Sequence, residues 1–346
     1  MISIQSLLKI SPQDLQVKPR EASAQWLRTA LQSAVALELA TIPPYLCARW
    51  SIKNLDPKDY VVRSLGSIVA EEMKHLGQVC NLMTAFGWTP LLNRRPAIPR
   101  YPGPLPGSVH PGLRLALKAL SKDLIGTAFM QIEFPSPEAV TTYGHKYYAT
   151  IGGFYAAIRE VVAAKTVPIV GGRQLDGGEG VDLISVTNYQ DALQAIDVIR
   201  SEGEGAHGSP FVEDEVAHYY RFAELFWQRK IQPCGTDGWG FCGDRIKFPG
   251  AGDIFAMAPV PRRGYPRLAA AQAFNRHYTA ILDKLQQAWT VTTGGQQILD
   301  QAVAIMTDLS PTSMTAIARQ LMDTPRPDGK GNYGPDFRYL KGCSLV

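Results

Sequence analysis

Two glutamates and a histidine occupy positions that a helical period would bury. Glu38 follows Ala34 by four residues and precedes Ile42 by four, so it lies within the apolar stripe of its helix. Glu72 lies in the same way on the stripe of a second helix, and His75, three residues further on, points to the same side. A buried carboxylate destabilises the fold strongly unless it is paired or bound to a metal. These three residues are therefore candidate metal ligands.

A third carboxylate extends this pattern. Glu133 lies on a third apolar stripe, near the C-terminal end of its helix, where the helix dipole disfavours a negative charge. Two-metal helical bundles of the ferritin-like type take one Glu from each of two helices and Glu-x-x-His from each of the other two. The order Glu38, Glu72-x-x-His75, Glu133 fits this scheme. Spacing alone does not select the fourth element, for which the candidates are Glu202, Glu204, His207, Glu215 and His218.

Apolar periodicity predicts the helices that would carry these residues. Strand–helix alternation is absent over most of the chain, so we expect a mainly α protein: a ferritin-like four-helix bundle with long loop insertions and extra C-terminal helices. Residues 1–325 would form this two-metal domain, and residues 326–346 an irregular tail. Long excursions are expected at 88–111, 166–187 and 232–266. The predicted helices cover 21–50, 60–86, 112–134, 188–206, 212–230, 268–290 and 296–322.

Composition excludes several classes of protein. The net charge is only +4 over 346 residues and no run of like charges occurs, so nucleic acid is not an expected partner. No apolar run of eighteen residues predicts a membrane span, and the first residues do not resemble a secretory signal. The five cysteines are scattered and odd in number, which favours free, mostly buried thiols in the cytoplasm. A zinc site at Cys234 and Cys242 is disfavoured because no second close Cys or His pair accompanies them.

Four short motifs resemble a known family. Glu38-Leu-Ala-Thr-Ile-Pro-Pro-Tyr-Leu46 and Glu71-Glu-Met-Lys-His-Leu76 are similar to the first two motifs of the ferritin-like domain named after iminophenyl-pyruvate dimer synthase. That domain also occurs in enzymes of violacein and rebeccamycin assembly. Glu202-Gly-Glu-Gly205 and His218-Tyr-Tyr-Arg-Phe222 resemble its third and fourth motifs. The resemblance spans about residues 20–320, although the dimerising enzymes of those pathways are much longer chains.

The resemblance implies a site with two Fe ions, with Mn or a mixed Fe/Mn pair as alternatives. It favours Glu204 over Glu202, because the first acidic position of the third motif is often not acidic in the family, and it favours His218 over His207. The ligands that it implies are Glu38, Glu72, His75, Glu133, Glu204 and His218.

These observations predict a non-haem two-metal oxidase or oxygenase that uses O₂ or peroxide. Its substrate would be a small amine, imine or aromatic amino-acid derivative in natural-product biosynthesis. The alternative is a non-catalytic ferritin-like protein that binds metal or escorts an unstable intermediate. The expected partners are the small-molecule substrate and O₂, and a homodimer is left open.

Overall fold

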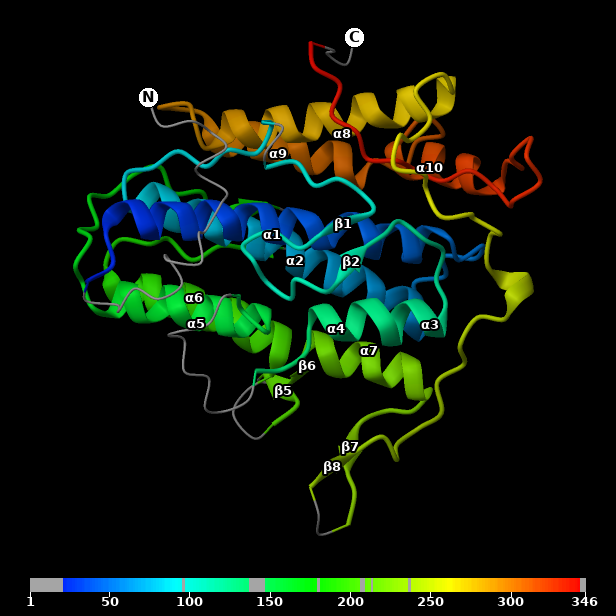
Figure 1. Cartoon of the computed structure of the whole chain (residues 1–346), viewed down its shortest axis with the longest axis horizontal. Helices are drawn as coiled ribbons and strands as arrows, with labels where there is room; N and C mark the ends of the chain where they lie inside the picture. The colour runs from blue at the N-terminus through cyan, green and yellow to red at the C-terminus, as the bar shows by residue number, and fades with distance from the viewer. Residues whose placement is uncertain are drawn as a thin grey trace.

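Two long antiparallel helices form the centre of the molecule (Figure 1). The computed structural model describes residues 21–94, 97–136, 147–178, 181–205, 209–212, 214–235 and 238–342. The central helices are α1 (Ala24–Trp50) and α2 (Tyr60–Ala85). Each begins at a residue whose side chain accepts backbone N–H bonds, Ser23 for α1 and Asp59 for α2. Most of α1 is buried, because helices pack against both of its faces.

The other two positions of the bundle are each filled by two successive helical pieces rather than by one helix (Figure 1). One piece lies under one half of the central pair and the second piece under the other half. The third position is built from α3 (Lys122–Leu124), a π-helical turn (Ile125–Phe129) and α4 (Met130–Ile132), followed by α5 (Ile151–Ala163). The fourth position is built from α6 (Tyr189–Glu204) and α7 (His218–Trp227).

Several predicted helix boundaries were wrong. The helix predicted over 112–134 begins only at Lys122, because Ser121 caps it by accepting from the Leu124 N–H group. Residues 114–115 pair instead with 103–104. The helix predicted from Val212 begins at His218, since Val212 lies in a hairpin. The α5 helix was not predicted.

Three further helices cover the opposite side of α1 and α2 (Figure 1). They are α8 (Ala269–Ala288), α9 (Gly295–Thr307) and α10 (Met314–Asp323). The single helix predicted over 296–322 is thus two helices, and the break falls at Pro311, which cannot continue a helix. Residues 326–342 contain no helix, yet Phe337 is buried and stacks on Trp50 at 6.1 Å between ring centroids. The proposed division at residue 325 stays a prediction.

The loops contain short antiparallel hairpins. They pair β1 (Gly103–Pro104) with β2 (Arg114–Leu115), β3 (Gly177–Gly178) with β4 (Val181–Asp182), β5 (Phe211–Val212) with β6 (Glu215–Val216), and β7 (Gln232–Pro233) with β8 (Trp239–Gly240). A 3₁₀ turn covers Ala251–Asp253. Among the described residues, no helix is long and apolar enough to cross a bilayer.

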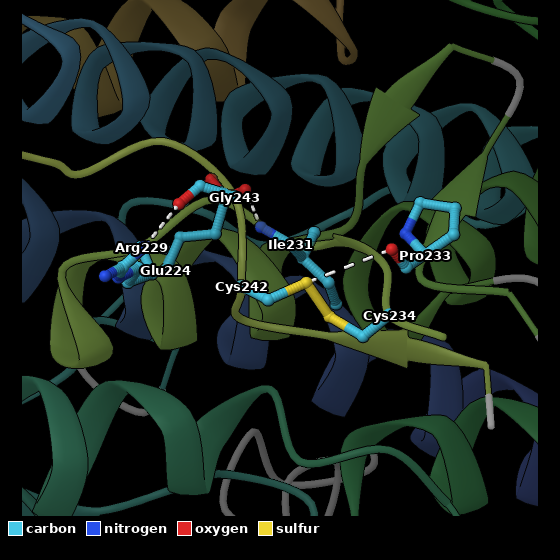
Figure 2. The surroundings of a disulfide bond; sticks show 7 residues. All are labelled: Glu224, Arg229, Ile231, Pro233, Cys234, Cys242 and Gly243. Atoms are coloured by element: carbon cyan, nitrogen blue, oxygen red, sulfur yellow. Dashed lines mark hydrogen bonds between the residues drawn. A yellow bond between two sulfur atoms is a disulfide. The ribbon is translucent and has the colours of Figure 1, made fainter. Parts of the chain in front are cut away.

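The expectation of free thiols was wrong for two of the five cysteines. Cys234 and Cys242 form a disulfide that closes the β7–β8 hairpin (Figure 2). Cys234 directly follows β7 and Cys242 lies two residues after β8, a local pairing that scattered cysteine spacing does not reveal. Cys47 and Cys80 are free and buried, as expected, and Cys343 lies outside the described residues.

Candidate metal centre

Five buried side chains converge between the central pair and the split helices. Glu38, Glu72 and His75 bring one ligand atom each within 4.8 Å of one another, and Glu72, Glu133 and His218 form a second group by the same measure. The five side chains are between 0% and 6% exposed. Glu72 belongs to both groups, so the cluster has two potential cation positions with one carboxylate between them.

The breaks in the split helices place two of these residues. Glu133 directly follows α4 as its C-terminal cap, and His218 is the first residue of α7. Glu38 comes from the middle of α1, and Glu72 and His75 from successive turns of α2. Four segments of the chain therefore contribute to one cluster. The interruption of each split helix lies next to the site.

Each histidine has a carboxylate partner on the side of its ring that faces away from the cluster. The Nε2 atom of His75 lies 2.9 Å from Glu202, and the Nε2 atom of His218 lies 2.9 Å from Glu71. An ionised carboxylate can only accept, so both Nε2 atoms donate to it. This arrangement leaves both Nδ1 atoms facing the cluster, the side from which ligand histidines in metal sites coordinate the ion.

The supporting carboxylates are themselves paired with cations. Glu202 accepts from the Lys74 ammonium group at 2.6 Å, and Glu71 accepts from the Arg221 guanidinium group at 2.8 Å. Although burial raises the pKa of Glu71, its bonds to His218 and Arg221 lower it well below its usual value. Neither role was predicted: Glu71 lies on the wetter flank of α2, and Glu202 was considered only as a ligand.

Three hydroxyl groups hold the carboxylates of the cluster. Tyr45 donates to Glu133 at 2.6 Å, Tyr155 donates to Glu38, and Thr41 donates to Glu72. Tyr155 comes from α5, the helix that sequence analysis missed. Each carboxylate thus keeps one oxygen in a hydrogen bond and has a second oxygen available for a cation.

Burial and the proximity of the carboxylates shift the pKa values of the cluster. Burial, reinforced by repulsion from Glu72, raises the pKa of Glu38 well above its usual value. Burial and repulsion from Glu72 also raise the pKa of Glu133. Burial by itself lowers the pKa of His218, but the neighbouring carboxylates of Glu133, Glu71 and Glu72 raise it well above its usual value. The site therefore attracts positive charge, whether it comes from protons or from a metal.

The cluster fits a metal ion on two counts. The Nδ1 atom of His218 is buried, lies 2.9 Å from Oε1 of Glu72 and 3.7 Å from Oε2 of Glu133, and has no hydrogen-bond partner among the described residues. A buried polar atom without a partner is costly, and a cation between these atoms would satisfy it. The donor set of carboxylates and imidazoles suits Fe(II) or Mn(II).

Three other residues were predicted or considered as ligands: Glu204, Glu215 and His207. Glu204 lines the space beside the cluster but belongs to neither ligand group, because its carboxylate accepts from the Ser136 N–H group at 2.7 Å and from Arg200 at 3.3 Å. Glu215 is exposed on β6. His207, the alternative to His218, lies outside the described residues.

The space beside the cluster is small. Among the described residues it measures about 20 Å³ and is lined by Ile132, Phe134, Gly152 and Glu204 together with ligand residues. A water molecule needs about 10–15 Å³ by this kind of measure, so the space accommodates a molecule of the size of water or O₂.

A helical bundle with a buried cluster of carboxylates and histidines at its centre defines a class of potential metal-binding proteins. A family model described as ferritin-like matches residues 31–227, more than half of the chain, and the chain belongs to that family. The matched region includes all five clustered residues.

One solved structure supports the fold over nearly the whole chain. A ferritin-like protein from Caulobacter vibrioides is similar with a TM-score of 0.60 and 20% sequence identity, covering 92% of this chain and 99% of the other. At this identity the likeness supports the fold alone. A search among curated proteins found no match. The narrower resemblance to the iminophenyl-pyruvate dimer synthase domain stays a prediction.

The support that Glu202 provides can be tested directly. We expect Glu202→Gln to weaken Fe(II) binding about 10- to 100-fold, because the charge that orients His75 and raises its basicity is lost. The measurement is an anaerobic Fe(II) titration of the purified chain. Asp197 lies on the same helix as Glu202 and forms an exposed ion pair with Arg159 of α5. Asp197→Asn removes this pair, is the matched control and should not change the affinity. Equal affinities of Glu202→Gln and the unaltered chain would contradict the assigned role.

Proposed function

We propose that the chain holds two metal ions, iron in the first place, and uses them to oxidise a small metabolite with O₂ or peroxide. The observation that carries the proposal is the convergence of two Nδ1 atoms and three carboxylates, with Glu72 common to both groups. Carboxylates and imidazoles are the donors that non-haem iron oxidases use, so these five residues would hold the ions that such chemistry needs. Manganese or a mixed pair would fit the same donors.

The side chains have separate tasks in this proposal. Glu38 with His75 would hold one ion, Glu133 with His218 the other, and Glu72 would bridge them. When bound, such ions supply the electrons that reduce O₂. Tyr45, Tyr155 and Thr41 orient the carboxylates, while the surrounding apolar residues exclude water.

The substrate class follows from the motif resemblance. The domain named after iminophenyl-pyruvate dimer synthase implies oxidative work on a small amine, imine or aromatic amino-acid derivative in natural-product biosynthesis. Glu38–Leu46 and His218–Phe222 carry this part of the proposal. The partners would be that metabolite and O₂, and a homodimer stays an open prediction. A cytoplasmic location also stays a prediction. The Cys234–Cys242 disulfide points the other way, because disulfides are more typical of oxidising compartments.

Metal loading followed by oxygen consumption tests the proposal. Purified protein treated with Fe(II) under anaerobic conditions should bind two iron ions per chain, measured by elemental analysis after desalting. Exposure to O₂ should then consume oxygen, and a screen of amines, imines and aromatic amino-acid derivatives should include one that accelerates the consumption. Binding of less than one iron per chain would contradict the proposal.

The small space beside the cluster favours a second candidate, a non-catalytic metal-binding protein. About 20 Å³ admits O₂ but not an aromatic metabolite unless the surrounding segments move. If this candidate is correct, the chain binds two irons and consumes O₂ in a single stoichiometric burst, and no metabolite in the screen changes the rate. Repeated turnover with one metabolite would instead support the oxidase.

A further inference from the structure

The two cation positions of the cluster have the same kinds of donors. The His218 position consists of Glu72, Glu133 and His218, and the His75 position consists of Glu38, Glu72 and His75. Each position thus offers one imidazole, one glutamate of its own and the shared carboxylate of Glu72. The supporting carboxylate of each histidine is also paired with one cation. Neither donor type nor charge therefore distinguishes the two positions.

The distances between the donor atoms do distinguish them. The Nδ1 atom of His218 lies 2.9 Å from Oε1 of Glu72 and 3.7 Å from Oε2 of Glu133. The Nδ1 atom of His75 lies 3.8 Å from Oε1 of Glu72 and 3.8 Å from Oε2 of Glu38. Metal bonds of about 2.1 Å, the length found for zinc with nitrogen and oxygen ligands, place two donors about 3.0 Å apart at a right angle and about 3.6 Å apart at 120°. The His218 position is therefore close to a bound arrangement, whereas the donors of the His75 position must approach one another.

An arginine fixes the partner of His218. The Arg221 guanidinium group donates to both oxygens of Glu71, through Nη1 at 2.8 Å and through Nη2, and Nη1 also donates to the Ser67 hydroxyl at 2.8 Å. A two-point contact with a planar guanidinium group fixes the orientation of a carboxylate as well as its position. The Arg221 side chain is 5% exposed and lies three residues after His218 on α7, while its two partners lie on α2. The network therefore joins the start of α7 to α2 and holds His218 in place.

The partner of His75 is held less firmly. Glu202 accepts at 2.6 Å from the Lys74 ammonium group, and the Lys74 side chain is 26% exposed. An ammonium group is a point charge on a flexible stem, so it does not fix the orientation of a carboxylate. The supporting carboxylates are themselves similarly exposed, at 18% for Glu202 and 24% for Glu71, so the difference comes from the cations. His75 therefore has more freedom to turn than His218.

We propose that the two positions fill in order, with the first ion at the His218 position and the second at the His75 position, and that Arg221 is the positioning residue that sets this order through Glu71. Donors that already lie near their bound arrangement lose less conformational freedom on binding, so they bind the ion more tightly. A chain supplied with one equivalent of metal would therefore hold it at the His218 position. This inference rests on the metal binding in the proposed function and does not depend on oxidase activity.

Variants that keep one position each test the order. Glu38→Ala retains His218 with its two carboxylates and Glu133→Ala retains His75 with its two, so each reports one affinity without repulsion from a second ion. In anaerobic calorimetric titrations with Fe(II), we expect the ion of Glu38→Ala to bind at least about tenfold more tightly than the ion of Glu133→Ala. Equal affinities, or tighter binding by Glu133→Ala, would overturn the proposed order.

Arg221→Lys tests the positioning residue, because it keeps the positive charge and removes the two-point contact. Combined with Glu38→Ala, it should weaken the retained ion about tenfold, and combined with Glu133→Ala, it should leave the affinity unchanged. The second combination is the control for folding, since a general loss of structure would weaken both. Ser67→Ala is a milder change that removes only the hydroxyl contact of Arg221, and it should weaken the ion of Glu38→Ala about two- to fivefold.

The results separate this inference from the proposed function. An equal effect of Arg221→Lys in both combinations, or no effect in either, would overturn the role of Arg221. Equal affinities of the two single-position variants, with two ions bound to the unaltered chain, would overturn the order and leave the proposed function intact. Absence of Fe(II) binding by the unaltered chain would overturn both.

Discussion

Replacing Glu72 with alanine is expected to reduce bound iron from two ions per chain to fewer than about 0.2. Glu72 belongs to both ligand groups, so its removal takes a donor from both cation positions at once. Glu38→Ala and Glu133→Ala each affect one group and should leave about one ion. The measurement is elemental analysis of desalted protein after anaerobic loading with Fe(II).

Two controls sharpen this experiment. Glu224→Gln alters a carboxylate that is 1% exposed and lies outside the cluster, so it tests whether any buried change lowers iron content; we expect two ions. Glu204→Gln should also retain two ions, because Ser136 and Arg200 hold its carboxylate away from both groups. One ion in Glu204→Gln would restore Glu204 to the ligand set that the sequence motifs imply. Two ions in Glu72→Ala would refute the bridging role.

Replacing Glu38 with glutamine is expected to stabilise the chelator-treated protein by about 1–3 kcal/mol, against the usual direction of core mutations. Burial and repulsion from Glu72 raise the pKa of Glu38, so folding must either bury a charge or take up a proton at neutral pH. Glutamine avoids both costs, and its amide oxygen can still accept the Tyr155 hydroxyl. Urea denaturation in the presence of a chelator measures the difference.

The pH dependence provides an independent check. Since the pKa of Glu38 in the folded state lies above its ordinary value of 4.5, its contribution to stability is fully present below that pH. The contribution is lost as the pH rises through the raised value. The advantage of Glu38→Gln should therefore grow from pH 4.5 upward.

Glu224→Gln is the opposite case and provides the control. Its carboxylate accepts from the Ile231 N–H group at 2.8 Å (Figure 2) and from Tyr60, and it lies 3.4 Å from the Lys230 ammonium group. Glu38, by contrast, is repelled by Glu72. We expect this change to destabilise the protein by about 1–3 kcal/mol. A destabilised Glu38→Gln protein would show that the cluster is satisfied without a cation.

Much of the fold was predictable because helical periodicity is a local property of the chain. The positions of Glu38, Glu72 and His75 on their apolar stripes predicted burial, and all three are at most 3% exposed. The same reasoning overextended the third helix to residue 112, because Leu113, Leu117 and Leu120 are buried at helical spacing without forming a helix. Burial has many causes, and periodicity alone does not separate them.

The split of two bundle helices was only partly predictable. The separate helices predicted over 188–206 and 212–230 placed a break in the fourth position, but α5, the second piece of the third position, was not predicted. His75 of α2 is paired with Glu202 of α6, and His218 of α7 is paired with Glu71 of α2. Their assignment needed the distances between helices.

By itself the amino-acid sequence determined that acidic and imidazole side chains would be buried on several helices, because the stripe of a helix depends only on nearby residues. It also determined the order in which these side chains follow along the chain. Only the tertiary structure decided that Glu72 is common to two groups and that Glu204 is held aside by Ser136 and Arg200. The reason is physical: the direction of a side chain is a local property, whereas the distance between two side chains depends on how every intervening segment packs.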